Sequence, residues 1–305
     1  MKKRTLKFVI GALLVTVLGG AMVGCGSSSN GGAKSDNGAK TESTDKVSGS
    51  ITLSGSTALL PLMEKAIDPY TKANPDAQIN AQGGGSGTGL TQVSDGSVDV
   101  GNSDIFAEEK LSADKAKELV DHKVCAEGFG IVVGKDLGID NLTSDQLKDI
   151  FSGKVTNWKD VGGPDKAILV VHRPSNSGTR ATFTTVVLGG DKSLENDSLG
   201  VTQDANGSVL SAMKENDGAI SYIGLAYMND QDAKNTLKLV KLDGVEANKD
   251  NISTGKYKFW SWGHMYTKGE ATGVAKDFID YCTNKIDKSV LDDLGFVAGS
   301  DMKVK

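Results

Sequence analysis

The sequence has few of the residues that hold metals or build disulfide frameworks. It contains three cysteines and three histidines in 305 residues. Cys25, Cys125 and Cys282 form no Cys-x-x-Cys pair and no Cys/His cluster, so we expect no structural metal. Two alternatives stay open for Cys125 and Cys282, a disulfide or two free thiols, because a sequence does not give the distance between them.

Fingerprints of nucleotide binding and of nucleophilic catalysis are also missing. The glycine-rich segment 83–89 does not have the Gly-x-Gly-x-x-Gly spacing, because Thr88 stands where the last glycine would be needed. No Lys-Ser or Lys-Thr follows a Walker-type loop. The histidines lie in no recognisable Ser/His/Asp motif, and no Gly-x-Ser-x-Gly elbow surrounds Ser86 or Ser177. We therefore expect a protein that is not an enzyme and has no cofactor.

Basic residues are too few for a nucleic-acid-binding protein. The chain has 34 Lys and Arg against 39 Asp and Glu, and four of the basic residues fall within the first seven. Removing those four leaves 30 basic residues and a formal charge of −9. That balance argues against nucleic acid, which requires a basic face. It does not exclude a small anion, since local donors decide the chemistry of a buried site.

The N-terminus has the pattern of a bacterial lipoprotein signal peptide over residues 1–24. A basic segment precedes an apolar run, Phe8–Leu18, that is too short for a membrane span. Met22-Val23-Gly24-Cys25 resembles a lipobox, in which the cysteine becomes the lipidated first residue. We expect Cys25 to anchor the protein to the extracytoplasmic face of the cell membrane. The alternative is ordinary secretion with an unmodified Cys25.

Residues 25–46 are rich in Ser, Gly, Asn, Lys and Thr, and they show no apolar periodicity. Such a segment cannot bury a core, so it is predicted to be a flexible tether. About 260 residues follow it, which is enough for one large or two medium domains. A folded, monomeric domain on a lipid-anchored tether is the arrangement that the sequence favours.

The folded part alternates short strands and helices, which indicates an α/β architecture. Gly, Ser or Asp stands at the carboxyl end of the first three strands, where open α/β sheets bind ligands. A β-rich run at 124–133, broken by Glu127-Gly128, is expected to carry the chain into a second lobe, and a run at 257–266 to bring it back. We predict strands at 49–53, 77–81, 98–101, 168–171 and 219–223. Helices are predicted at 59–73, 142–151, 177–188, 209–214, 271–281 and 289–294, and the glycine loop at 82–90 is expected to lead into a further short helix that ends at 93. Pro69 is expected to kink or split the first helix.

One strand-to-helix junction has the composition of an anion site. The apolar run 168–171 leads into Arg173 and then into a predicted helix that begins at or near Ser177. Free N–H groups and the positive end of the helix dipole make such a junction receptive to anions. A serine at a helix start is often only a cap, so the prediction depends on similar chemistry elsewhere in the chain.

Four segments in register give that support. They are Gly55-Ser56-Thr57-Ala58, residues 83–89, Gly101-Asn102-Ser103-Asp104 and Arg173-Pro174-Ser175-Asn176-Ser177-Gly178-Thr179. Together they resemble the phosphate-binding lipoproteins of ABC-type phosphate importers, and the likeness covers nearly all of the chain from residue 47. It implies a two-lobed periplasmic-binding-protein fold of type II, with two crossover strands as the hinge. Lobe I would comprise 47–126 and 252–305, and lobe II 127–251.

The resemblance also implies a set of phosphate-binding residues. In such proteins the donors and acceptors come from the four segments, and here they would be Thr57, Ala58 (through its N–H), Ser86, Asp104, Arg173, Ser177, Gly178 and Thr179. Ser56 and Ser103 are further candidate donors. The implied function is a high-affinity receptor that closes on inorganic phosphate and delivers it to the permease subunits of an ABC transporter.

Asp104 is the informative member, because a carboxylate repels an anion unless the ligand donates a proton to it. Hydrogen phosphate and dihydrogen phosphate carry such a proton and sulfate does not, so Asp104 would exclude sulfate. Three alternatives remain from sequence alone. They are a receptor for another oxyanion such as sulfate, molybdate or tungstate, a secreted phosphatase or other hydrolase using Ser177 or Thr57, and a surface adhesin or signalling receptor.

Overall fold

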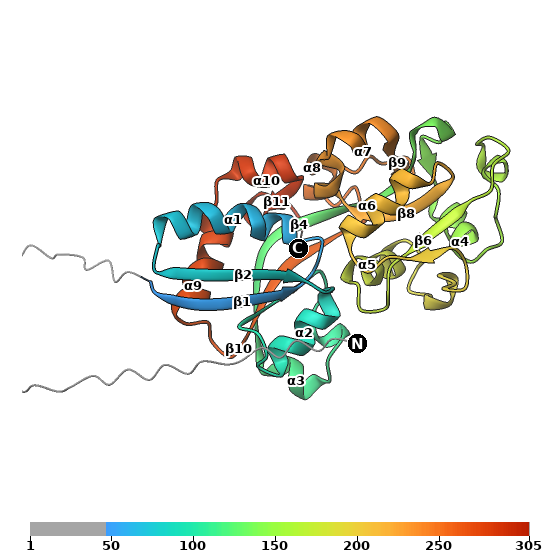
Figure 1. Cartoon of the computed structure of the whole chain (residues 1–305). Coiled ribbons are helices and arrows are strands. Elements are labelled where there is room, and N and C mark those ends of the chain that lie inside the picture. Colours follow the sequence, from blue (N-terminus) through green and yellow to red (C-terminus); the bar gives the residue numbers. More distant parts are fainter. Residues whose placement is uncertain (1–46, 305) are drawn as a thin grey trace, which may run out of the picture. The chain divides into compact units, whose positions relative to one another are not determined.

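The computed structural model describes residues 47–304, in which strands and helices alternate as expected for an α/β protein (Figure 1). The predicted signal peptide at 1–24 and the predicted tether at 25–46, with Cys25, lie outside the described residues. Among the helices of residues 47–304, none combines the length and the apolar composition that crossing a membrane requires.

The described strands form a hydrogen-bonded sheet in the order β2-β1-β3-β10-β4-β8-β6-β7. β1 is parallel to β2 and β3, whereas β10 runs antiparallel to β3 and β4. Off this path, β11 and β9 pair with β4, and β5 pairs with β9. The strand bounds are β1 Gly49–Gly55, β2 Ala77–Gly83, β3 Val100–Ser103, β4 Leu119–Gly134, β5 Asn141–Leu142, β6 Leu169–His172, β7 Val201–Thr202, β8 Ala219–Gly224, β9 Leu237–Leu242, β10 Trp260–Lys268 and β11 Phe296–Ala298.

Helices pack along these strands on both lobes (Figure 1). Their bounds are α1 Leu60–Ala73, α2 Ser86–Ser94, α3 Ala113–Lys117, α4 Ser144–Phe151, α5 Gly178–Val186, α6 Asn206–Glu215, α7 Gln231–Thr236, α8 Lys249–Ser253, α9 Gly273–Asp280 and α10 Lys288–Leu294. The sequence predicted α1, α2, α4, α5, α6, α9 and α10 to within a few residues. It did not predict α3, α7 and α8, each of which is only five or six residues long.

β4 connects two lobes, each with its own hydrophobic core. We call the part around β1, β2 and β3 lobe I, and the part around β6, β8 and β9 lobe II. Residues 119–128 of β4 pair with β10, and residues 129–134 pair with β8 and β9. Fully buried Leu53, Leu62 and Phe278 belong to the core of lobe I, and Phe151, Trp158 and Phe183 belong to that of lobe II.

The predicted break in the β-rich run at Glu127-Gly128 was wrong. β4 continues through both residues, with Glu127 paired to Ser261 and Gly128 paired to Trp260. A Cβ on Gly128 would overlap the side chain of Ile252 and would lie 2.6 Å from Cδ1 of Leu225. A glycine is therefore needed at position 128 because Ile252 and Leu225 pack closely against the strand, and not because the chain turns there.

α1 is a single helix, so the alternative that Pro69 splits it was wrong. Pro69 removes one backbone donor, but Tyr70, directly after it, is 1% exposed and its hydroxyl donates to Asp277 Oδ2 over 2.9 Å. Tertiary packing of the buried face therefore holds the helix together past the proline. Pro61 is accommodated because it lies in the first turn.

The return strand begins later than predicted. β10 starts at Trp260 and not at Tyr257, because the backbone N–H of Tyr257 is hydrogen-bonded outside the sheet. Its N–H donates to the carbonyl of Asn251 over 2.9 Å, which ties it to the end of α8, and its hydroxyl donates to the carbonyl of Phe129 over 2.8 Å. Tyr257 therefore fastens lobe II to the middle of β4.

Cys125 and Cys282 are free thiols, and both are fully buried. Burial raises the pKa of both thiols, so neither forms a thiolate readily near neutral pH. We expect the number of cysteines that react with a maleimide to rise by two when the protein is unfolded in denaturant without reductant. An unchanged number of reactive thiols would indicate that the two are oxidised to a disulfide in the purified protein.

Candidate functional site

The eight residues that the resemblance implies for phosphate binding, and Ser56 as a ninth, come together in one buried cluster where the two lobes meet. Each of them is buried, and the most exposed, Thr57, is 5% exposed. They come from the ends of β1, β3 and β6 and from the starts of α2 and α5. Because these are carboxyl ends of strands and amino ends of helices, the cluster is rich in backbone N–H donors.

The loop after β1 contributes Ser56, Thr57 and Ala58. The Ser56 hydroxyl oxygen accepts the N–H groups of Ala58 and Leu59, each over 3.0 Å, so Ser56 holds the turn that precedes α1. The Ala58 N–H, predicted to face the ligand, is thus shared with a hydroxyl of its own loop. Thr57 Oγ1 accepts the side-chain amide and the backbone N–H of Asn206 over 3.0 and 3.2 Å, and one Arg173 nitrogen over 3.3 Å.

The glycine loop positions Ser86 against Asp104. Gly85 has a φ of +88°, which turns the chain from β2 into α2 at a place where a side chain would be strained. The Ser86 hydroxyl oxygen then accepts the Asp104 N–H over 2.9 Å. Ser103, the other candidate donor of this segment, is used locally, since its hydroxyl donates to the Ile105 carbonyl over 2.7 Å.

Asp104 has one occupied and one free carboxylate oxygen. Oδ2 accepts the hydroxyl of Thr179 over 3.3 Å, a contact that joins the two lobes. Oδ1 is buried and has no hydrogen-bond partner among the described residues. A buried acceptor without a partner is costly, so it indicates the place of a donor on a ligand.

Arg173 is held rigidly with part of its guanidinium unused. Its Nε donates to the Gln203 carbonyl over 3.0 Å, and Nη2 donates to the Asp204 carbonyl over 3.1 Å. Nη1 is buried and has no partner among the described residues. Burial lowers the pKa of Arg173, but a guanidinium stays charged because its usual pKa is far above neutrality. A fixed cation with a free N–H is a donor for an anion.

A second buried network, centred on Glu195, contacts the backbone of Arg173. Glu195 Oε1 accepts the Tyr222 hydroxyl over 2.7 Å and lies 3.1 Å from His172 Nδ1. Arg180 lies 3.2 Å from the other oxygen of Glu195, and its Nη1 donates to the Arg173 carbonyl over 2.5 Å. His172 is therefore a strand residue paired with a carboxylate, away from the hydroxyls of the site.

Residues 177–179 open α5. Ser177 is the N-cap, and its hydroxyl oxygen accepts the Arg180 N–H over 3.2 Å. Gly178 lies directly against lobe I: a Cβ there would overlap the Ser86 hydroxyl and would be 2.8 Å from Asp104 Oδ2. Glycine therefore permits the closest approach of the two lobes.

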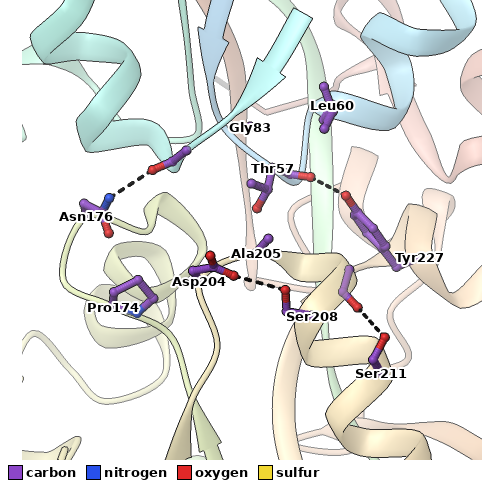
Figure 2. A pocket seen from close by; sticks show the side chains of 12 residues that line it. Thr57, Leu60, Gly83, Pro174, Asn176, Asp204, Ala205, Ser208, Ser211 and Tyr227 are labelled. Atoms are coloured by element: carbon purple, nitrogen blue, oxygen red, sulfur yellow. Dashed lines mark hydrogen bonds between the residues drawn. The ribbon is translucent and has the colours of Figure 1, made fainter. Parts of the chain in front are cut away.

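A groove of about 710 Å³ lies beside the cluster, with lining residues from both lobes (Figure 2). Of the nine predicted residues only Thr57 lines it, because the other eight are buried beneath. Two hydrogen bonds cross it: Tyr227 donates to the Thr57 carbonyl over 2.7 Å, and Asn176 donates to the Gly84 carbonyl over 2.9 Å. We call this groove the mouth of the site, and the two hydrogen bonds narrow it.

Three residues that the sequence did not single out belong to the site. Asn206 ties Thr57 to lobe II, and its Oδ1 accepts the Gly224 N–H over 2.9 Å. Asn176 bonds the glycine loop, and Glu127 is buried beside Asp104. Only Asn176 could have been found, since it lies inside one of the four segments. Asn206 and Glu127 stand outside any motif. No group of three or more candidate metal ligands occurs within residues 47–304.

Comparison with known proteins shows which family this chain resembles. The sequence profile of the PBP superfamily domain matches residues 40–285. Phosphate-binding protein PstS of Bacillus subtilis (strain 168) is 45% identical over 249 residues, which cover 81% of this chain and 80% of that protein. The PstS of Staphylococcus saprophyticus is 31% identical over 247 residues, covering 77% and 73%.

Solved structures show the same relationship. A protein from Clostridium perfringens with bound phosphate, described as a phosphate ABC transporter substrate-binding protein, is 29% identical and superposes with a TM-score of 0.74. The match covers 82% of this chain and 99% of that one. An ABC-type phosphate transport receptor from Vibrio cholerae is 25% identical, with a TM-score of 0.63 and coverage of 82% and 100%.

The fold and the buried cluster between the lobes define a two-lobed substrate-binding protein, as the superfamily match requires. Within that class, the chain belongs to the family of PstS phosphate-binding proteins.

Proposed function

We propose that this protein is an extracytoplasmic receptor that binds inorganic phosphate between its lobes and delivers it to an ABC importer. One observation carries the proposal: the buried cluster contains both a cationic donor and an anionic acceptor without protein partners, Arg173 Nη1 and Asp104 Oδ1. An oxyanion that also carries a proton satisfies both atoms. The family relationship and the phosphate-bound relative from Clostridium perfringens support the same ligand.

The chemistry of the site explains how a small, strongly hydrated anion can be bound. A buried anion loses its hydration and needs many donors in return. The hydroxyls of Thr57, Ser86 and Ser177, the N–H groups at the start of α5 and the Arg173 guanidinium supply them. Each charge-assisted hydrogen bond contributes about 1.5–3 kcal/mol.

Hydrolysis has less support than binding. His172 is held by Glu195, His264 Nδ1 lies 2.7 Å from Asp121, and His122 Nε2 lies 3.2 Å from Thr267. None of these histidines of the described residues forms a hydrogen bond with Thr57 or Ser177, so neither hydroxyl has a histidine as its general base. The relatives are binding proteins by name, and a receptor function requires no chemical step.

The remaining features are part of the same proposal. A lipid on Cys25 would hold the protein at the outer face of the membrane, and residues 25–46 would let a monomeric domain reach the permease. Lobe I would comprise 47–126 with 252–305, and lobe II 127–251. The change of pairing partners along β4 at residues 128–129 supports the first of these boundaries. Release would follow when the permease opens the lobes.

Isothermal titration of the protein with phosphate and with sulfate tests the proposal directly. We expect saturable binding of phosphate and none, or far weaker binding, of sulfate. Preference for sulfate, molybdate or tungstate would instead support the receptor for another oxyanion, and turnover of a chromogenic phosphate ester would support a hydrolase. Absence of binding by any of these anions would refute the proposal.

Replacing Asp104 with asparagine should relax the rejection of sulfate. In the wild type, Asp104 Oδ1 would face a sulfate oxygen, and two acceptors cannot form a hydrogen bond. The asparagine amide can donate a hydrogen bond to that oxygen. An unsatisfied buried polar pair costs about 1–3 kcal/mol, so the ratio of sulfate to phosphate affinity should rise about tenfold or more. Competition titration with both anions measures it. Asp68→Asn, the same change on the exposed face of α1, is the control. Equal selectivity in wild type and Asp104→Asn would contradict the role.

A further inference from the structure

Glu127 carries a buried carboxyl group that has no role in the phosphate binding proposed above. It lies on β4, is 1% exposed, and no N–H or hydroxyl group of the described residues donates a hydrogen bond to either of its oxygens. It pairs with Ser261 on one side and with Phe296 on the other. Glu195, the other glutamate that is buried in the described part of the chain, contacts a histidine, a tyrosine and an arginine. Glu127 has no such cation.

The group that Glu127 does meet is Asp104. The charge of Asp104 and a side-chain hydrogen bond with it both act on the Glu127 carboxyl. Ionised carboxylates can only accept hydrogen bonds, so a contact between two of them requires a proton on one. Asp104 already accepts from Thr179. Burial, and then the charge of Asp104, raise the pKa of Glu127 well above its usual value, which places the proton on Glu127.

The other ionisable groups around this pair do not neutralise Glu127. Cys125 and Tyr227 lie near enough to interact with it, and burial raises the pKa of each, so both are neutral. Lys123 is held over the rings of Phe106 and Trp262, 5.1 and 5.4 Å from their centres, and His264 is paired with Asp121. Arg173 acts on Asp104 and contacts Thr57.

A second groove borders Asp104, the partner of Glu127. A groove of about 280 Å³ is lined by Asp104 and by Ser261, the strand neighbour of Glu127, together with Phe106, Glu109, Lys123, Trp260, Trp262 and His264. Phe106, at its rim, is 42% exposed. A proton can therefore exchange with water without the main mouth between the lobes opening.

We propose that Glu127 is a positioning residue that stays protonated in the phosphate complex, donates its O–H to Asp104 and so keeps the free oxygen of Asp104 aimed at the proton of the ligand. The inference rests on the proposed function. It makes phosphate binding depend on a proton that is held by the protein, separately from the proton held by the ligand.

The direction of the pH effect follows from linkage. Bound phosphate adds negative charge near Glu127 and favours its protonated form further. Below the pKa of Glu127 in the free protein, the residue is already protonated and binding takes up no proton there. Above it, binding must take up a proton, so affinity falls as pH rises, by up to tenfold per pH unit for a full proton.

The test is calorimetric titration of the full chain with phosphate between pH 6 and pH 10, in buffers of different ionisation enthalpy, which counts the protons taken up. Glu127→Gln keeps the shape and a donor but cannot titrate. Phosphate itself titrates in the same way with both proteins, so the difference in proton uptake between them comes from Glu127. We expect wild type to take up more protons than Glu127→Gln at the upper end of this range, with a steeper loss of affinity. Glu108→Gln, an exposed neighbour of the groove, should behave as wild type.

Equal proton uptake and parallel affinity profiles in wild type and Glu127→Gln would overturn the inference, since a merely structural glutamate would lower affinity at all pH values alike. If Glu127→Gln does not fold, infrared difference spectra of wild type decide the matter. A protonated-carboxyl band in the phosphate complex that shifts on 13C-glutamate labelling supports the inference, and its absence refutes it. Failure of wild type to bind phosphate at any pH would instead refute the proposed function, which keeps the two outcomes distinct.

Discussion

Gly178→Ala is expected to weaken phosphate binding by roughly 100-fold. The added methyl group would overlap the Ser86 hydroxyl and would lie 2.8 Å from both Cβ and Oδ2 of Asp104. Gly178 has no positive φ, so alanine suits its backbone and the effect falls on the contact between the lobes. Overpacking of this kind costs about 1–3 kcal/mol, and 2.7 kcal/mol corresponds to roughly 100-fold in affinity.

Gly207→Ala is the matched control for this substitution. Gly207 lines the mouth of the site from α6, also without a positive φ, and a Cβ there would meet only a Tyr227 ring carbon at an ordinary 3.7 Å. We expect its phosphate affinity to stay within about twofold of wild type, a change of less than 0.5 kcal/mol. Titration calorimetry on the three proteins makes the comparison. Wild-type affinity in Gly178→Ala would show that the lobes need not approach this closely to hold the ligand.

Arg173→Met should weaken phosphate binding by about 100-fold or more. Methionine fills a similar volume but removes the buried guanidinium, whose Nη1 is the unpaired donor of the site. Two charge-assisted hydrogen bonds of about 1.5–3 kcal/mol each are at stake, which sets the lower limit of the loss. Arg173→Lys should fall between, because an ammonium keeps the charge but cannot reach both the carbonyls and the ligand.

Stability must be separated from binding in this case, because the change also leaves the carbonyls of Gln203 and Asp204 without their donor. Thermal unfolding in the absence of phosphate measures that cost by itself. Lys110→Met, which removes an exposed cation, controls for the loss of positive charge near the cleft. Affinity equal to wild type in a folded Arg173→Met would exclude Arg173 as the principal donor.

The fold was predictable from sequence where local pattern and tertiary packing agree. The apolar patterns gave α1, β1 and β6 to within a few residues, because burial of apolar side chains decides each of them. The failures have a common cause. At Pro69 and at Gly128 the local preference is to break an element, but burial of Tyr70 and the packing of Ile252 and Leu225 override it.

The candidate site was predictable only through its motifs. Segments with Gly, Ser, Thr and Asp at strand ends mark backbone that approaches a ligand, and their resemblance to the phosphate-binding lipoproteins implied residues such as Thr57 and Ser177. Asn206 and Glu127 could not, because each acts through a partner that is distant in sequence. Asn206 meets Thr57 across 149 positions, and Glu127 looks like an ordinary strand residue until Asp104 is placed beside it.

The hydrogen bonds between the lobes have a consequence for the energetics of uptake. Thr57 with Asn206, Asn176 with the glycine loop and Thr179 with Asp104 join the lobes through protein atoms alone. Each contributes about 0.5–1.5 kcal/mol, so they raise the closed fraction of the ligand-free population. A larger closed fraction makes the free receptor resemble the loaded one. Phosphate therefore supplies only part of the free energy of lobe closure, and the permease must distinguish the loaded receptor from a ligand-free receptor that also closes.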